Sequence, residues 1–171
     1  MTPEKTIIKS YNIDNADEYQ QTLSLYNLPA EFSYLPIQTF KQGKTIFLMF
    51  LEKEYSFWWF KYKKETIIGY CITQNANELT PSCREYIEDI YSISQSIAIQ
   101  YPLIISDFMI ANEFRRNGYG HKFATHLIDK IYLNQNISLY AKGDGVYFWP
   151  KLGFNKVDNT TSILIKSNIP K

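Results

Sequence analysis

The chain has 171 residues, of which 45% are hydrophobic and 20% are charged, and its formal net charge at pH 7 is +1. This length suits one globular domain, which we expect to span residues 1–171. The small net charge argues against general attraction to nucleic acid or to an anionic membrane, so we expect neither as a partner.

The N-terminal residues lack the continuous apolar core of a signal peptide, and a cytoplasmic setting is the default expectation. Cys71 and Cys83 form no CxxC or Cys/His array, so we expect neither a metal site nor a disulfide framework.

Residues 6–10 predict a first strand. Asp14 or Asn15 is a candidate cap for a helix that runs to Leu28, before Pro29. The apolar run Thr45–Leu51 favours a buried strand and is too short to span a bilayer.

The middle of the chain predicts a hairpin and then a helix. Ser56–Tyr62 and Thr66–Thr73 have strand-like composition and flank the polar residues 63–65, where we place the turn. The first of these strands has aromatic residues on both faces, so we expect both faces to be buried. Its alternative role is to line an acceptor pocket. Ser82 and Glu85 stand at capping-box spacing, which predicts a helix that ends before Pro102.

The C-terminal part of the chain alternates strands and helices in a regular order. The predicted elements are a strand at Leu103–Ala111, a loop at Asn112–Gly120, an amphipathic helix from about His121 to Leu133, a strand at Ile137–Ala141, a helical segment at Asp144–Leu152 and a hairpin formed by Phe154–Val157 and Ser162–Lys166. Gly153 is a suitable left-handed cap for the helical segment. These patterns predict an α/β (α+β) fold with a mixed, mostly antiparallel sheet flanked by helices.

The loop before the amphipathic helix carries the chemical signal. Gly118 and Gly120 stand where the first turn of the helix offers unpaired backbone N–H groups and a partial positive charge. Without side chains there, an anionic ligand can approach those groups closely. The alternative is a basic turn with glycine caps, because an isolated R-x-x-G-x-G is a weak signal.

Two motifs resemble the GNAT superfamily of acyl-CoA N-acyltransferases. Residues 115–120 (RRNGYG) match its Arg/Gln-x-x-Gly-x-Gly/Ala signature. Residues 141–154 (AKGDGVYFWPKLGF) resemble its Ala-x-x-x-Ala/Gly-x-x-Phe-Tyr-x-Lys-Leu-Gly-Phe segment. The resemblance covers the C-terminal part of the chain, whereas the N-terminal part agrees only in the order of its elements. It implies a central strand that splays from its neighbour.

The resemblance also implies how acetyl-CoA binds. Backbone amides from Arg116 to His121 would hold the pyrophosphate, and the backbone of Phe108 and Ile110 would pair with the pantetheine arm. Arg115, Arg116 and Lys122 are phosphate partners or, equally, a solvated basic rim. The candidate cofactor-binding residues are Phe108, Met109, Ile110, Arg115, Arg116, Asn117, Gly118, Tyr119, Gly120, His121 and Trp149.

The catalytic groups are less well defined. The family's usual tyrosine acid is replaced by Trp149, for which we predict an apolar wall beside the thioester. Tyr147 is the candidate acid in its place, although a thiolate can also leave unaided. Asp107 is the candidate base, because burial makes a carboxylate more basic. Its alternative is a structural pair with an arginine or lysine.

These features predict an acetyl-CoA-dependent N-acetyltransferase that acts on a primary amine of a small molecule or a protein. The first alternative is a GNAT module that binds CoA without catalysing transfer, as the substitution by Trp149 would allow. The second is acyl transfer to aminoacyl-tRNA, against which the net charge argues. The identity of the acceptor and the oligomeric state do not follow from the sequence.

Overall fold

The computed structural model describes residues 4–33, 35, 43–78, 93–159 and 162–168. The predicted capping box at Ser82 and Glu85 therefore lies outside the described residues, as does Cys83. Among the described residues, no helix is long and apolar enough to cross a membrane.

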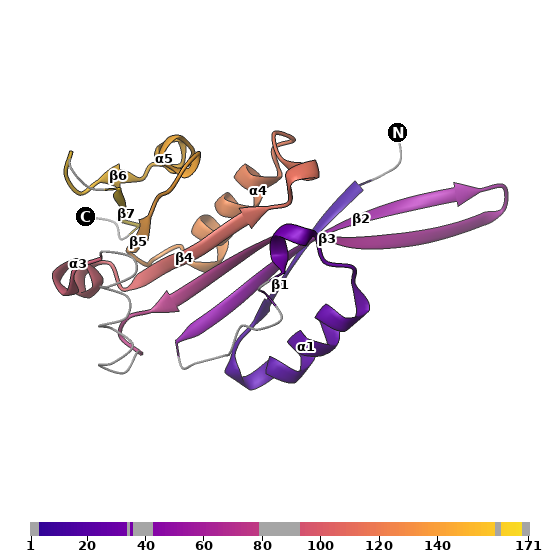
Figure 1. The fold of residues 1–171 in the computed structure, drawn as a ribbon, viewed down its shortest axis with the longest axis horizontal. Coiled ribbons are helices and arrows are strands. Elements are labelled where there is room, and N and C mark those ends of the chain that lie inside the picture. The colour runs from indigo at the N-terminus through magenta and orange to yellow at the C-terminus, as the bar shows by residue number, and fades with distance from the viewer. Residues whose placement is uncertain (1–3, 34, 36–42, 79–92, 160–161, 169–171) are drawn as a thin grey trace.

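A seven-stranded sheet in the order β1-β2-β3-β4-β5-β7-β6 forms the centre of the molecule (Figure 1). All neighbouring strands are antiparallel except β4 and β5, which are parallel. This mixed, mostly antiparallel sheet confirms the predicted fold class. The strands are β1 (Glu4–Tyr11), β2 (Lys44–Phe57), β3 (Phe60–Asn75), β4 (Leu103–Ile110), β5 (Ile137–Tyr140), β6 (Asn155–Lys156) and β7 (Ile163–Lys166).

Helices cover both faces of the sheet (Figure 1). Helix α4 (Tyr119–His126) packs through Phe123 into one apolar core, and α1 (Ala16–Leu25) packs through Tyr19 into a second. The strands supply both cores because successive side chains point to opposite faces. In β2, Met49 belongs to the core under α4 and Phe50 to the core under α1.

The other helical elements are short. They are η1 (Ile13–Asn15), η2 (Ala30–Phe32), α3 (Gln95–Gln100), η4 (Asn112–Phe114), η5 (Leu127–Ile131), α5 (Gly145–Phe148) and η6 (Trp149–Leu152). The π-helical η5 continues α4, so the helix predicted from about His121 to Leu133 is present with a change of hydrogen bonding in its last part. Gly153 has φ 84° and ends η6 in the left-handed conformation, as predicted.

The hairpin turn is not where the sequence placed it. Phe57 pairs with Phe60, so the turn lies at Trp58 and Trp59, and residues 63–65 are inside β3. The expectation that this aromatic segment is buried on both faces is also wrong, since Trp58 is 81% exposed and Trp59 84%. The charged residues 63–65 gave a false turn signal. They tolerate strand geometry because the two-stranded ribbon is largely open to solvent there.

Candidate functional site

Strands β4 and β5 separate partway along their length. Their parallel pairing covers only three residue pairs and ends at Ile105↔Leu139. Beyond that point β4 follows β3, whereas β5 follows β7, so the sheet opens between them. The register of β3 and β4 shifts by one residue at the same place, which makes Ser106 the extra residue of a β-bulge. A bulge bends its strand and increases the local twist, so its position fits the separation.

The opened edge of β4 presents backbone groups to the gap. The N–H of Ala111 donates to the carbonyl of Ile68 in β3 at 2.9 Å. Because alternate residues direct these groups to opposite sides, Phe108 and Ile110 direct theirs away from β3 and into the gap. The carbonyl of Ile110 already accepts a hydrogen bond from Nε of Arg115 at 2.9 Å. Met109 is opposite Tyr70 in β3, so its backbone groups face the neighbouring strand instead.

The loop after β4 brings a helix start to the same gap. Gly118 is the N-terminal cap of α4 with φ 80°, and as a glycine it has no side chain that could cap the helix. The first-turn N–H groups of Tyr119, Gly120 and His121 consequently have no acceptor within the helix. Arg116 also has a positive φ of 63°, an uncommon conformation for a residue with a side chain. Such backbone strain is concentrated at functional sites.

Two contacts at the ends of this loop fix it to the rest of the fold. The N–H of Asn112 donates to Oε1 of Glu31 at 2.8 Å, and this hydrogen bond lowers the pKa of the Glu31 carboxyl. The hydroxyl of Tyr119 donates to Oε2 of Glu4 at 2.8 Å. The sequence indicated neither contact, because Glu31 and Glu4 are distant in the chain. Together they hold the helix start against the N-terminal half of the protein.

Aromatic side chains form the opposite wall of the gap. Phe108 lies 5.1 Å from Trp149 and 5.7 Å from Phe148 between ring centroids. Trp149 is only 5% exposed and also packs on Phe154. That Trp149 is an apolar wall beside the thioester stays a prediction. The indole N–H can donate a hydrogen bond but cannot deliver a proton at neutral pH.

Asp107 lies half-buried at the bulge. The hydroxyl of the fully buried Tyr70 donates a hydrogen bond to Oδ2 of Asp107 at 3.2 Å. The buried Cys71 is close by, and burial raises the pKa of its thiol well above the usual value, with the charge of Asp107 adding to the effect. Cys71 is therefore an inert thiol. The Asp107 carboxylate has a fixed donor and reaches the gap.

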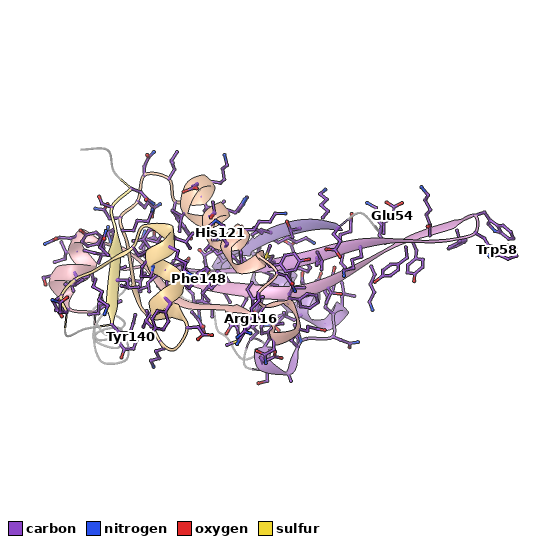
Figure 2. All side chains as sticks on the ribbon, turned by 90° about the horizontal axis from the view of Figure 1, so that it is seen from above. Glu54, Trp58, Arg116, His121, Tyr140 and Phe148 are labelled. Atoms are coloured by element: carbon purple, nitrogen blue, oxygen red, sulfur yellow. The ribbon has the colours of Figure 1, made fainter. Side chains whose placement is uncertain are left out.

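These elements enclose a cleft of about 830 Å³. Figure 2 shows Arg116 and His121 on one side of it and Phe148 and Tyr140 on the other. Such a volume suits a cofactor-sized ligand. Of the predicted site residues, the cleft is lined by Asp107, Phe108, Met109, Ile110, Arg115, Arg116, Gly118, Gly120, His121 and Trp149.

Three predicted residues are not part of the cleft lining. Asn117 is exposed, Tyr119 is bonded to Glu4, and the side chain of Tyr147 is 74% exposed. Sequence reasoning missed Lys142, which lines the cleft with its Nζ 5.3 Å from the ring centroid of Tyr140. Its place directly after the strand 137–141 was the available signal.

The comparisons with known proteins bear on the fold. No protein-family model matches the chain, and no curated protein matches it. A crystal structure of AtaTR bound with AcCoA is similar, with a TM-score of 0.54 and 13% identity over 95% of this chain and 93% of that chain. The structure of a KacTA–DNA complex has a TM-score of 0.52 and 13% identity, over 96% of this chain and 94% of that chain. This similarity confirms the GNAT-like fold that the two motifs predicted.

Proposed function

We propose that this protein transfers an acetyl group from acetyl-CoA to a primary amine of a small molecule or a protein. The observation that carries the proposal is the cleft between β4 and β5, into which the first turn of α4 opens. That AtaTR was solved with AcCoA supports the same ligand here.

The residues around the cleft fit acetyl-CoA in two respects. Arg116 and the first turn of α4 supply positive charge and N–H donors for a pyrophosphate. A Cβ at Gly120 would make ordinary contacts, at 3.5 Å from Ile110 and 3.7 Å from Phe148, so a longer side chain there would narrow the passage between the loop and these two residues. The free backbone groups of Phe108 lie beyond this passage and can pair with an extended pantetheine arm.

Acetyl-CoA supplies an activated acyl carbonyl, and the protein must accept the proton that the attacking amine releases. Asp107 lines the cleft and has a fixed donor in Tyr70, so it is the base in this proposal. No acidic side chain is required for the departing thiolate, whose conjugate thiol has a pKa of about 8.5. Trp149 then excludes water from the thioester end.

The test uses purified protein, acetyl-CoA and a panel of primary amines, with free thiol as the readout. Thiol release should require both the protein and an amine. Asp107→Asn should lower kcat by about 100-fold, the usual contribution of a general base, while the affinity for CoA stays unchanged. Asp144→Asn is the matched control, because Asp144 is also a carboxylate in the cleft lining.

The alternative function is a module that binds CoA without transferring the acetyl group. Trp149 favours it, since the position holds no proton donor. Stabilisation by CoA together with no thiol release for any amine would support the module. Full activity in Asp107→Asn would remove Asp107 from the proposed reaction while leaving the transferase in place.

A further inference from the structure

Strands β2 and β3 extend beyond the rest of the sheet as a two-stranded ribbon, residues 54–63, which we call the arm (Figure 1). The pairing of β1 with β2 ends at Lys53, and that of β4 with β3 ends at Gly69. Within the described part of the chain, no strand pairs with the outer edges of the arm. An isolated two-stranded ribbon is marginally stable in water, so contact with another surface would stabilise the arm.

The arm has one aromatic and one polar face. Residues that face each other across the ribbon share a face, and successive pairs alternate. The pair Tyr55↔Tyr62 stacks with ring centroids 5.1 Å apart, and Phe60 is two residues from Tyr62 on the same face. Glu54 lies on the other face (Figure 2), where Lys61 approaches it at 3.7 Å. The arm is thus an amphipathic ribbon, with aromatic side chains on one face and charged side chains on the other.

The aromatic side of the arm and its tip are open to solvent. Trp58 is 81% exposed, Trp59 84% and Phe60 65%, and Tyr55 and Tyr62 are also exposed. At roughly 200 Å² per aromatic side chain, these five leave about 600 Å² in water. This value is at the upper end of the largest apolar patches on monomeric proteins, and such patches usually mark an interface.

The backbone at the tip points to the same conclusion. Trp58 has φ 54°, a left-handed conformation that glycine or asparagine normally supplies in a two-residue hairpin loop. A bulky side chain is strained there. The tip therefore holds a tryptophan in a conformation that favours other residues, and strain of this kind points to a function for the side chain.

We propose that the arm is a self-association surface, on which two copies of this chain pack their aromatic faces together about a twofold axis. Two facing arms would bury at most about 1,200 Å² in total if all of this area became covered, which reaches the lower end of a specific interface. The same patch on both copies satisfies the isologous contact that a twofold dimer requires.

Charge and backbone both favour a second copy over other occupants. On the polar face, Lys63 lies 2.9 Å from Glu52 and Lys61 is paired with Glu54, so little free positive charge remains for phosphates. With a net charge of +1, two copies repel each other only weakly. A hydrocarbon layer would leave the unpaired edges of the arm without hydrogen bonds, whereas packing of two aromatic faces leaves those edges accessible to water.

The arm is remote from the cleft, so association leaves the cleft accessible. Figure 2 shows Trp58 at the far end of the molecule from Phe148 and Tyr140. The proposal is therefore independent of the acetyl transfer, and each can fail without the other.

The experiment is sedimentation velocity of the purified full chain over a dilution series. The wild type should dimerise in the micromolar range. Phe60→Glu puts a charge on the aromatic face of both copies and should weaken the dimer by at least about 100-fold, as expected for a central aromatic contact. Ser56→Glu is the matched control, since it adds the same charge to the polar face of the arm and should leave the dimer intact. Circular dichroism checks that both variants are folded.

Tryptophan fluorescence gives a second readout. Burial of Trp58 and Trp59 should shift the emission to shorter wavelength as the concentration rises, and Phe60→Glu should abolish this shift. A wild type that stays monomeric at every concentration overturns the proposal, and so does an equal effect of the two substitutions. A monomer that sediments with phosphatidylcholine vesicles would also overturn it and assign the arm to a lipid surface.

Discussion

Nε of Arg115 donates a hydrogen bond of 2.9 Å to the carbonyl oxygen of Ile110, the last residue of β4. The first arginine of the glycine-containing loop thus holds that loop against the strand it has just left. We predict that Arg115→Lys and Arg115→Ala weaken CoA binding equally, by about fivefold, the net value of one hydrogen bond. Lysine keeps the charge but has no Nε, and isothermal titration calorimetry measures the affinity.

Lys122 provides the control for charge. It is exposed in the first turns of α4 and is not part of the cleft lining, so Lys122→Ala should change the affinity much less. If Arg115→Lys keeps wild-type affinity while Arg115→Ala loses it, Arg115 acts as a charge on the ligand and the hydrogen bond to Ile110 is incidental.

The two glycines of the loop should respond differently to substitution. A Cβ at Gly118 has no atom within 4 Å, but its φ of 80° is unfavourable for alanine, so Gly118→Ala should lower Tm by about 2–4 °C and still bind CoA. Gly120→Leu should abolish the thermal stabilisation by CoA, because its side chain would enter the passage beside Ile110 and Phe148. Full stabilisation in Gly120→Leu would remove the loop from the binding site.

Tyr147 should not be essential for turnover. Its side chain is 74% exposed and does not line the cleft, so Tyr147→Phe should change kcat by no more than about threefold. The amine-dependent release of thiol gives kcat. A loss of about 100-fold with unchanged CoA affinity is the signature of a general acid and would make Tyr147 catalytic.

Because of Tyr26, the free energy of unfolding should fall as the pH rises in the alkaline range. Burial and a hydrogen bond of 2.6 Å to Glu65 raise the pKa of Tyr26 to about 12. The folded state favours the protonated phenol, so this stabilisation is complete below the unfolded pKa of about 10 and is lost as the pH rises through about 12. Tyr26→Phe should therefore be less stable than the wild type at neutral pH. Urea unfolding should show that difference shrinking above pH 10, and a constant difference would contradict the assignment.

The C-terminal half of the fold was predictable because its signals are local. Gly118 and Gly153 mark a helix start and a helix end, and the apolar residues between 121 and 133 recur with helical spacing. The cleft lining from Asp107 to His121 followed from the same stretch. Lys142 and Tyr140 were not among the predicted site residues, because their place in the cleft depends on where β5 separates from β4, and that is a tertiary property.

The arm could not be predicted from local signals. Two-residue hairpin loops usually contain glycine or asparagine, and Trp58 and Trp59 give no such signal. The polar residues 63–65 matched the usual composition of a turn better than the two tryptophans did. The sequence does contain the correct alternation of aromatic and polar residues, with Tyr55 and Phe57 on one strand and Phe60 and Tyr62 on the other. This alternation can be recognised only when the turn is placed between Phe57 and Phe60.

The bulge at Ser106 has a consequence for how such a cleft is encoded. On both sides of it, Ile105 and Phe108 face the core under α4, so removing the bulged residue would restore regular alternation without moving any apolar side chain to the other face. The opening of the sheet thus coincides with a change in the number of residues in β4, while the apolar residues on either side of the bulge keep the face that a regular strand would give them.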